Sequence, residues 1–458
     1  MWQRFYLLLL ITFVSIAFGA EPVKPNILFI LSDDMGYADA GFQGAKDIKT
    51  PVLDALAKSG TILDAHYVQP VCSPTRSSLL TGRYVAHTGV YTIVRPNAKW
   101  GLPLEERTLA QALREAGYET ALTGKWHLGE YKTAYQPTQR GFDHQYGLWF
   151  GMGDYYKHTR DNQVDWHRDD KPCDEVGYST HLIAKEACKL VEQSKGDKPL
   201  FLYLPFQAVH GPMQVPESYL KQYGDLKEPR KTYAGMLSAL DEAVGQVLAA
   251  FDKKGLRENT LIIFSSDNGG PSPGRVTHNT PLRAGKGTIF EGGVRTCAFA
   301  TWPGKIPAGQ TIKEPVHIID WYPTLLKLAQ ASPEQKRTVD GRDIWPVLTQ
   351  NAKSPHDAIL LSGTNGTSAA IRMGEWKLLV GAADSGVGEE EEGPKKAKKK
   401  KAGEDGPQSV LLFNLEKDIS EKTNVATENP EIVKKLRARL DELRKDAVEP
   451  GNKTLDEK

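Results

Sequence analysis

Two short polar clusters each follow an apolar run, where oxygen ligands could meet a metal ion. One cluster comes after residues 25–31 and the other after residues 260–264. The cluster residues are Asp33, Asp34, Asp267 and Asn268. Three carboxylates and an amide oxygen suit a hard divalent cation such as calcium or magnesium rather than zinc. A single Asp-Asp pair is more often a helix cap or a turn, but two clusters at equivalent strand ends favour a metal site.

A third group surrounds Cys72, in the segment Cys-Ser-Pro-Thr-Arg-Ser-Ser-Leu-Leu-Thr-Gly-Arg of residues 72–83. Pro74 fits the first turn of a helix, which places Cys72 at the amino end. Backbone N–H groups and the helix dipole favour an anionic oxygen there. Arg76 lies one turn further along. A single cysteine is ordinarily a small buried hydrophobe, but these neighbours indicate a chemical role.

Basic side chains occur in three further segments. Gly124 lets the chain turn so that Lys125 and His127 share one side, and His210 and Lys286 each follow another predicted strand. A lysine and a histidine two positions apart are, taken alone, more typical of an exposed strand face. Together with the acidic clusters they form a candidate anion-binding site.

The elements that must position these residues alternate between strands and helices. Buried strands are predicted at 25–31, 199–204 and 260–264, and helices at 51–59, 108–116 and 233–251. This order predicts an α/β fold with a large mixed, mostly parallel sheet covered by helices on both faces. Ligands bind beyond the carboxyl ends of such strands, where the polar clusters fall.

The composition changes after about residue 355, so we predict a catalytic domain at 21–355 and a smaller C-terminal α+β domain at 356–458. The C-terminal part contains predicted strands at 371–380 and 409–414. A helix at 430–446 has one apolar face. The intervening residues 381–407 are low in complexity and highly charged, which predicts a solvated disordered loop or, alternatively, a polyanion-binding arm.

The 458 residues contain 58 Lys+Arg and 57 Asp+Glu, so no overall field attracts nucleic acid or an anionic membrane. Residues 1–20 combine Arg4, an apolar run at 5–18 and small residues at the end, which predicts a signal peptide. A membrane anchor is the alternative, although the run is short of the ~20 residues that a span needs. Four cysteines do not make a disulfide framework, and a Cys173–Cys188 bridge stays open.

The segments at 72–83 and 117–127 resemble the two signature segments of the sulfatase family, within the alkaline phosphatase superfamily. The resemblance covers nearly all of residues 25–450 and is strongest to the arylsulfatase B group, the N-acetylgalactosamine-4-sulfatases. It is supported by residues 124–129, 140–143, 154–156, 206–216, 233–236, 281–283 and 317–321.

The resemblance implies that a formylglycine-generating enzyme oxidises Cys72 during export to an aldehyde whose hydrate attacks sulfate esters. It implies one calcium ion, with Mg²⁺ less favoured, held by Asp33, Asp34, Asp267, Asn268 and the formylglycine oxygen of residue 72. Arg76 and Lys125 would stabilise the hydrate, and His127 would hydrogen-bond to it. Lys125 and Lys286 would hold the sulfate oxygens, and His210 would protonate the leaving oxygen.

We therefore expect an exported, formylglycine-dependent sulfatase that acts on sulfated carbohydrate and has no stable membrane anchor. The compartment would be periplasmic, extracellular or lysosome-like. A phosphodiesterase or phosphonate hydrolase on the same scaffold, or a non-catalytic glycan-binding protein, are the alternatives. Gly211 and Met213 depart from the arylsulfatase B pattern, which leaves the sugar open. Residues 154–158 form either a sugar-contacting rim or ordinary aromatic packing.

Overall fold

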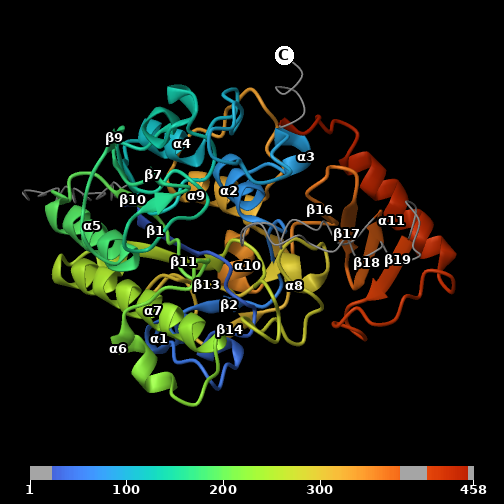
Figure 1. Ribbon diagram of the computed structural model, residues 1–458. Coiled ribbons are helices and arrows are strands. Elements are labelled where there is room, and N and C mark those ends of the chain that lie inside the picture. Colours follow the sequence, from blue (N-terminus) through green and yellow to red (C-terminus); the bar gives the residue numbers. More distant parts are fainter. Residues whose placement is uncertain (1–22, 382–409, 452–458) are drawn as a thin grey trace, which may run out of the picture.

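The computed structural model describes residues 23–381 and 410–451 (Figure 1). The predicted signal peptide and the charged insertion after Gly381 lie outside the described residues. Within the described part of the chain, no helix is both long and apolar enough to cross a membrane.

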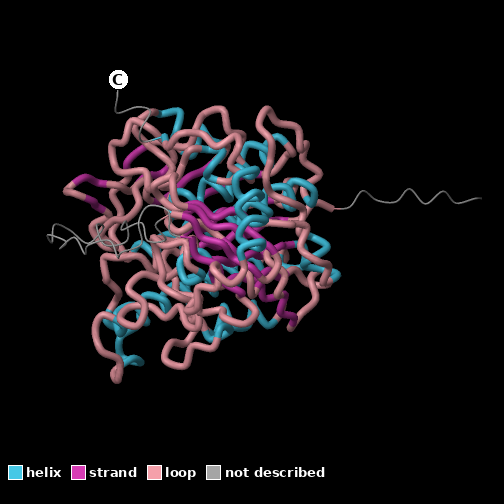
Figure 2. Tube along the Cα trace, turned by 90° about the vertical axis from the view of Figure 1, so that its right-hand side faces the viewer, coloured by secondary structure: helices cyan, strands magenta, loops and turns pink. Residues whose placement is uncertain are grey.

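A large sheet forms the centre of the molecule, with helices around it (Figure 2). Its strand order is β14-β2-β13-β11-β1-β10-β4-β5-β8-β9, and the five strands from β11 to β5 are parallel. The predicted large, mixed and mostly parallel sheet is thereby confirmed. The strands are β1 (Asn26–Ser32), β2 (Thr61–Leu63), β4 (Glu119–Thr123), β5 (His144–Gly147), β8 (His167–Arg168), β9 (Lys171–Pro172), β10 (Leu200–Pro205), β11 (Thr260–Ser266), β13 (Ala298–Thr301) and β14 (Gln310–Ile312).

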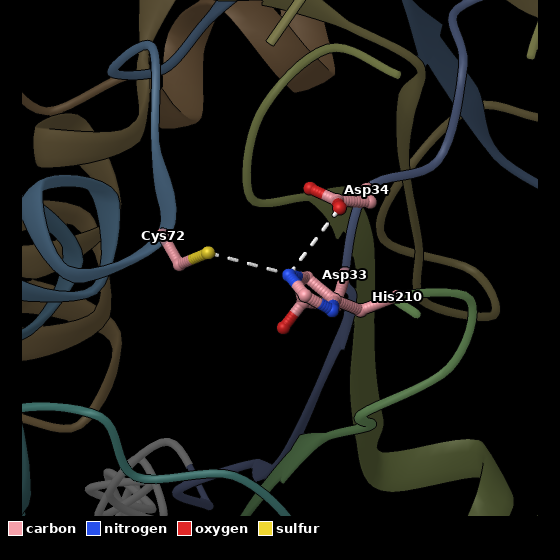
Figure 3. A group of neighbouring side chains, drawn as sticks. All are labelled: Asp33, Asp34, Cys72 and His210. Carbon is pink, nitrogen blue, oxygen red and sulfur yellow. Dashed lines mark hydrogen bonds and ion pairs between the residues drawn. The ribbon is translucent and has the colours of Figure 1, made fainter. Parts of the chain in front are cut away.

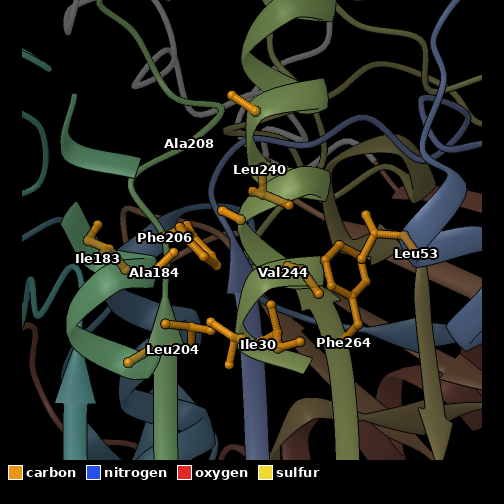
Figure 4. Close-up of a cluster of buried hydrophobic side chains, with 14 of the residues drawn as sticks. Ile30, Leu53, Ile183, Ala184, Leu204, Phe206, Ala208, Leu240, Val244 and Phe264 are labelled. Atoms are coloured by element: carbon orange, nitrogen blue, oxygen red, sulfur yellow. The ribbon is translucent and has the colours of Figure 1, made fainter. Parts of the chain in front are cut away.

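Helices cover both faces of this sheet because its central strands are apolar on both sides. In β1, Leu28 and Ile30 pack in one core cluster, whereas Ile27 and Phe29 pack in the opposite one. Figure 4 shows the first cluster, where side chains of α1, α5 and α7 lie against the strands. The helices on this side are α1 (Pro51–Lys58), α5 (Ser179–Gln193) and α7 (Arg230–Lys253). Those packed in the second cluster are α2 (Cys72–Thr81), α4 (Leu109–Glu115), α9 (Trp321–Leu328) and α10 (Trp345–Gln350).

The predicted elements of the large sheet agree closely with the observed bounds. Strands β1, β10 and β11 and helices α1 and α4 start within one residue of their predicted positions. Helix α4 is capped by Thr108, whose side chain accepts a hydrogen bond from the backbone of Gln111 while the Gln111 side chain accepts one from the backbone of Thr108. Helix α7 begins three residues earlier than predicted, at Arg230.

The C-terminal part is a four-stranded antiparallel sheet with one helix against it, on one side of the molecule (Figure 1). The prediction of a single strand at 371–380 is wrong. The chain reverses at Gly374, whose φ of +58° suits glycine, and forms a hairpin of two paired strands. The elements are β16 (Ile359–Ser362), β17 (Ala369–Met373), β18 (Trp376–Val380), β19 (Val410–Asn414) and α11 (Pro430–Leu443).

Short elements connect the two parts. Strand β3 pairs with β12 and β15 in a small sheet, and Tyr67 of β3 packs in a cluster with the C-terminal sheet. The remaining elements are α3 (Val85–Thr88), α6 (Glu217–Leu220), α8 (Glu291–Val294), β3 (His66–Tyr67), β6 (Thr159–Arg160), β7 (Gln163–Val164), β12 (Arg295–Thr296) and β15 (Val316–His317).

Candidate active site

The structure brings every sequence-predicted site residue to the carboxyl edge of the large sheet. Each of four neighbouring parallel strands ends in or is followed by such residues, and α2 adds two more from its amino end. The strand β1 leads to Asp33 and Asp34, β11 to Asp267 and Asn268, β10 to His210, and β4 to Lys125 and His127. Figure 3 shows Asp33, Asp34, Cys72 and His210 converging on one point.

Asp33 is the centre of one half of the site. Its Oδ1 lies 3.7 Å from Cys72 Sγ. Its Oδ2 accepts hydrogen bonds from Arg76 Nη2 at 3.0 Å and from Lys125 Nζ at 2.5 Å. Arg76 Nη2 also donates to Asp267 Oδ2 at 2.8 Å. All these side chains are fully buried. A buried charge is costly unless it is paired, and here each carboxylate lies beside a cation that neutralises it.

Asp34 is the centre of the other half. Its Oδ1 accepts a hydrogen bond from Asn268 Nδ2 at 2.7 Å, and its Oδ2 accepts one from Lys286 Nζ at 3.0 Å. His210 Nε2 lies 3.1 Å from Lys286 Nζ and 3.5 Å from Asp34 Oδ2. The other ring nitrogen, Nδ1, is 2.7 Å from Gly211 O. With the proton on Nδ1 for this bond, Nε2 is the nitrogen that faces the site.

Close backbone approaches explain why glycines precede or follow these residues. At Gly124, φ is +135° and an added Cβ would lie 1.9 Å from Pro205 O. The chain therefore crosses the end of β10 in contact, and Lys125 N donates to Pro205 O at 2.7 Å. At Gly269, an added Cβ would lie 1.7 Å from Gly292 O. Any other residue would push Lys125 or Asn268 out of position.

Burial and charge set the protonation of the site. Burial, followed by the Asp33 carboxylate, raises the pKa of the Cys72 thiol well above its ordinary value, so the sulfur is neutral. Burial opposes the charge of Lys125, but the Asp33 carboxylate outweighs it and raises the pKa of Lys125. Burial and Asp33 also raise the pKa of Asp267. As encoded, Cys72 is thus a poor nucleophile, because the thiolate is the reactive form.

The donor atoms fit a hard divalent cation. Ligand atoms of Asp33, Asp34, Cys72 and His210 all lie within 4.8 Å of one another. Asn268 Oδ1 is buried, and no partner within the described residues hydrogen-bonds to it. Buried acceptors are normally hydrogen-bonded, so a bound cation would supply the partner that this oxygen lacks. The set is rich in carboxylate and amide oxygens, which calcium and magnesium prefer.

In the segment 154–158, some side chains are buried in aromatic packing and others are exposed as a sugar-contacting rim would be, so both interpretations of the sequence apply to part of it. Tyr155 and His158 are buried, and the His158 ring stacks on Trp166 at 4.4 Å, so these two belong to packing. Tyr156 and Lys157 are exposed.

The cysteines at 173 and 188 are free thiols, so the structure has no bridge between them.

Two residues near the site, Gly151 and Asn279, were not found from the sequence, and the contact of Tyr155 with His210 was not found either, although the segment 154–158 was. An added Cβ at Gly151 would lie 2.4 Å from His127 Cε1, so this glycine packs on the imidazole. The Tyr155 hydroxyl donates to His210 O at 2.7 Å. Asn279 accepts from Tyr37 N and Gly270 N and donates to Ala284 O, which joins the loops carrying the acidic pairs and Lys286. A spacing signal could not have found them, because each acts through a long-range contact.

Known proteins are similar to this chain over most of their length. A protein-family model described as Sulfatase matches residues 25–331. Arylsulfatase J of Mus musculus is 39% identical over 464 residues, covering 93% of this chain and 76% of that protein. N-acetylgalactosamine-6-sulfatase of Canis lupus familiaris is 32% identical over 400 residues, covering 81% and 74%. The crystal structure of Ps i-CgsB in complex with k-i-k-neocarrahexaose has a TM-score of 0.84 and 34% identity, covering 93% of this chain and 94% of that one.

Proposed function

The chain belongs to the sulfatase family and hydrolyses sulfuric esters, and we propose that it does so on a sulfated saccharide through a formylglycine made from Cys72. One observation carries the proposal. The side chain of residue 72 begins α2 and lies 3.7 Å from Asp33, among Arg76 and Lys125, as a buried neutral thiol. Such a thiol is unreactive, whereas an aldehyde hydrate there has oxygens to offer both the cations and a substrate.

The residues that would hold a divalent cation are Asp33, Asp34, Asp267, Asn268 and the oxygen on residue 72, with calcium preferred over magnesium. When bound, the ion supplies positive charge that makes the hydrate more acidic and polarises a sulfate oxygen. Removal of the ion would leave Asp33 and Asp267 with Arg76 and Lys125 as their counter-charges among the described residues.

In the first step, one hydroxyl oxygen of the residue 72 hydrate attacks sulfur, and the bond from sulfur to the sugar oxygen breaks. Lys125 and Lys286 bind the sulfate oxygens, where negative charge is spread in the transition state. A sugar alkoxide is a poor leaving group, so His210, protonated on Nε2 as well as on Nδ1, delivers its Nε2 proton to it. General acid catalysis of this kind contributes about 10²–10⁴-fold.

In the second step, the remaining hydroxyl of residue 72 gives its proton to water, the carbon–oxygen bond to sulfate breaks with its electron pair leaving on the sulfate, and the aldehyde re-forms. Water then restores the hydrate. We expect His127 to hydrogen-bond to this group, and the bond from Ser73 Oγ to the His127 backbone oxygen at 2.8 Å supports this by holding the two segments side by side. A serine at position 72 has only one hydroxyl and cannot complete this step.

The Cys72→Ser variant is therefore expected to transfer sulfate to itself once and stop. Incubation with p-nitrophenyl sulfate should release at most one equivalent of p-nitrophenol per enzyme, and the peptide containing residue 72 should carry a sulfate. Sustained turnover by this variant would contradict the mechanism.

The substrate class rests on the relatives. One is by name an N-acetylgalactosamine-6-sulfatase, and another is solved with a neocarrahexaose. Our specific hypothesis is N-acetylgalactosamine 4-sulfate or a related polysaccharide sulfate, as in the arylsulfatase B group. A screen of sulfated mono- and disaccharides tests it, with an aryl phosphodiester measured alongside. Preference for the phosphodiester would favour the hydrolase alternative, and saccharide binding without turnover would favour the glycan-binding one.

Export is part of the same proposal, because the formylglycine-generating enzyme acts on the chain during export. The apolar run at 5–18 and the small residues after it support cleavage after Gly19 or Ala20. The amino-terminal sequence of the mature protein checks this expectation. A mature chain that begins at residue 1 would contradict it.

A further inference from the structure

Residues 151–158 run along the candidate active site from His127 to His210. At one end, Gly151 packs on the His127 ring, where a Cβ would lie 2.4 Å from Cε1. Further along, the Tyr155 hydroxyl donates to His210 O at 2.7 Å and to Gln207 O at 3.2 Å. The segment therefore forms one wall of the site, between the proposed hydrate partner and the proposed acid.

The tip of this wall is held in one conformation. Asp154 Oδ1 accepts hydrogen bonds from the backbone N–H groups of Tyr156 at 2.9 Å and Lys157 at 2.7 Å. Asp154 Oδ2 accepts from Gln214 Nε2 at 2.9 Å, and Gln214 Oε1 accepts from Tyr155 N at 2.8 Å. Because Gln214 follows His210 by four residues, the tip is fastened to the segment that carries the acid.

The tip presents two side chains to solvent. Tyr156 is 43% exposed, and its ring leans on Tyr178 at 5.4 Å, which supports it from one side. Lys157 is exposed beside it. Within the described ranges, Tyr131 and Tyr156 are the exposed aromatic side chains. An exposed aromatic face on a fixed turn, with a cation next to it, is suited to bind a ring that has an apolar face and an anionic substituent.

We propose that Tyr156 and Lys157 form a subsite for the saccharide unit next to the one that loses its sulfate. Tyr156 stacks under the ring of that unit, and Lys157 pairs with its anionic group, a sulfate or a carboxylate. The subsite rests on the proposed function, because it needs a saccharide in the neighbouring site. It explains how the chain distinguishes an oligosaccharide from a small aryl sulfate with the same reacting group.

The test compares kcat/KM for an oligosaccharide with kcat/KM for p-nitrophenyl sulfate, which is too small to reach the subsite. The oligosaccharides are a carrageenan hexasaccharide, whose anionic groups are sulfates, and a chondroitin sulfate tetrasaccharide, which also offers carboxylates. We expect the ratio to fall about tenfold in Tyr156→Ala, the effect of losing one aromatic contact worth about 1.4 kcal/mol. A fall in Lys157→Gln with both oligosaccharides identifies sulfate as the partner, and a fall with chondroitin sulfate alone identifies carboxylate.

The chain offers a matched control in Tyr131-Lys132, its other exposed Tyr-Lys pair among the described residues. Tyr131→Ala and Lys132→Gln should leave the ratio unchanged. An unchanged ratio in the Tyr156 and Lys157 variants overturns the subsite, as does a fall of equal size in the control variants. Wild-type protein that hydrolyses p-nitrophenyl sulfate, but is neither inhibited by the oligosaccharides nor active on them, also overturns it. Wild-type protein inactive on every sulfate ester overturns instead the proposed function.

Discussion

A buried triad of charges joins the C-terminal sheet to the segment that carries Lys286. Lys377 Nζ of β18 lies 2.8 Å from Glu291 Oε1 and 3.0 Å from Glu421 Oε1, and all three side chains are fully buried. Glu421 Oε2 also accepts from Glu291 N at 2.6 Å, and Glu421 O accepts from Arg283 Nη1 at 2.6 Å. The Lys377→Met variant keeps the length of the side chain and removes the charge that the two carboxylates share.

The expected loss in the free energy of unfolding depends on how Glu291 and Glu421 are neutralised once Lys377 is absent. Breaking a buried ion pair costs about 3–5 kcal/mol. Arg295 Nη1 stays 3.4 Å from Glu291 Oε2, so the lower end applies. Glu421 can also take up a proton, since burial, only partly offset by Lys377, already raises its pKa from 4.5 to about 7. Because this pKa is already high in the wild type, protonation of Glu421 adds little further cost at pH 7, and we expect a loss of about 3 kcal/mol there from the broken ion pairs.

The loss should grow as pH rises above 7. In the wild type the pKa of Glu421 is already raised from 4.5 to about 7, so between pH 5 and 7 both folded proteins hold more protons than the unfolded chain and lose stability in parallel. Without Lys377 the pKa of Glu421 rises further. Above pH 7 the folded variant therefore keeps a proton that the folded wild type releases, and each further pH unit lowers the stability of the variant by about 1.4 kcal/mol relative to the wild type.

Urea unfolding followed by tryptophan fluorescence at pH 7 and pH 9 measures this loss. The matched control is Lys353→Met, because Lys353 pairs with Glu314 at 2.8 Å but its side chain is 91% exposed. That variant should unfold at the wild-type urea concentration. A Lys377→Met loss below about 1 kcal/mol at pH 7, or one that does not grow between pH 7 and pH 9, would refute the reasoning about the buried triad.

Two further substitutions test the site and the fold. In Gly151→Ala the new methyl group displaces the His127 ring, so kcat should fall about 100-fold with the unfolding midpoint unchanged, and wild-type kcat would show that the ring position is unimportant. His87 Nδ1 lies 2.8 Å from Asp340 Oδ2, and although burial opposes the charge, Asp340 raises the pKa of His87 above 6.5. This stabilisation is complete below pH 6.5 and lost as pH rises through the raised pKa, so Asp340→Asn should lower the unfolding midpoint more at pH 6 than at pH 9, and equal losses would contradict the assignment.

The sheet and the clustering of the candidate site could be predicted because both depend on local patterns. Apolar runs such as 25–31 and 260–264 have few alternatives to a strand buried on both faces. Once these strands are parallel neighbours, their carboxyl ends coincide. Asp33 and Asp267 must then meet, although 234 positions separate them in sequence, and Pro74 predicts the helix start that brings Cys72 to the same edge.

Contacts between loops could not be predicted. Gly151 packs on His127, and Asn279 links three loops, but neither position has a periodic pattern or an unusual neighbour in sequence. The charge triad is similar, since Lys377 is a single charged residue next to Trp376 and the apolar residues 378–380 of β18, which in the sequence is typical of an exposed position. Its burial depends on Glu291 and Glu421, which come from separate segments. The hairpin at Gly374 was missed because apolar residues continue on both sides of the turn.

The mass of the peptide that contains residue 72, taken from protein isolated from its native host, tests the central claim most directly. The account predicts formylglycine at this position, visible as replacement of the thiol by an aldehyde, in protein that hydrolyses a sulfate ester. An unmodified Cys72 in fully active protein would contradict it.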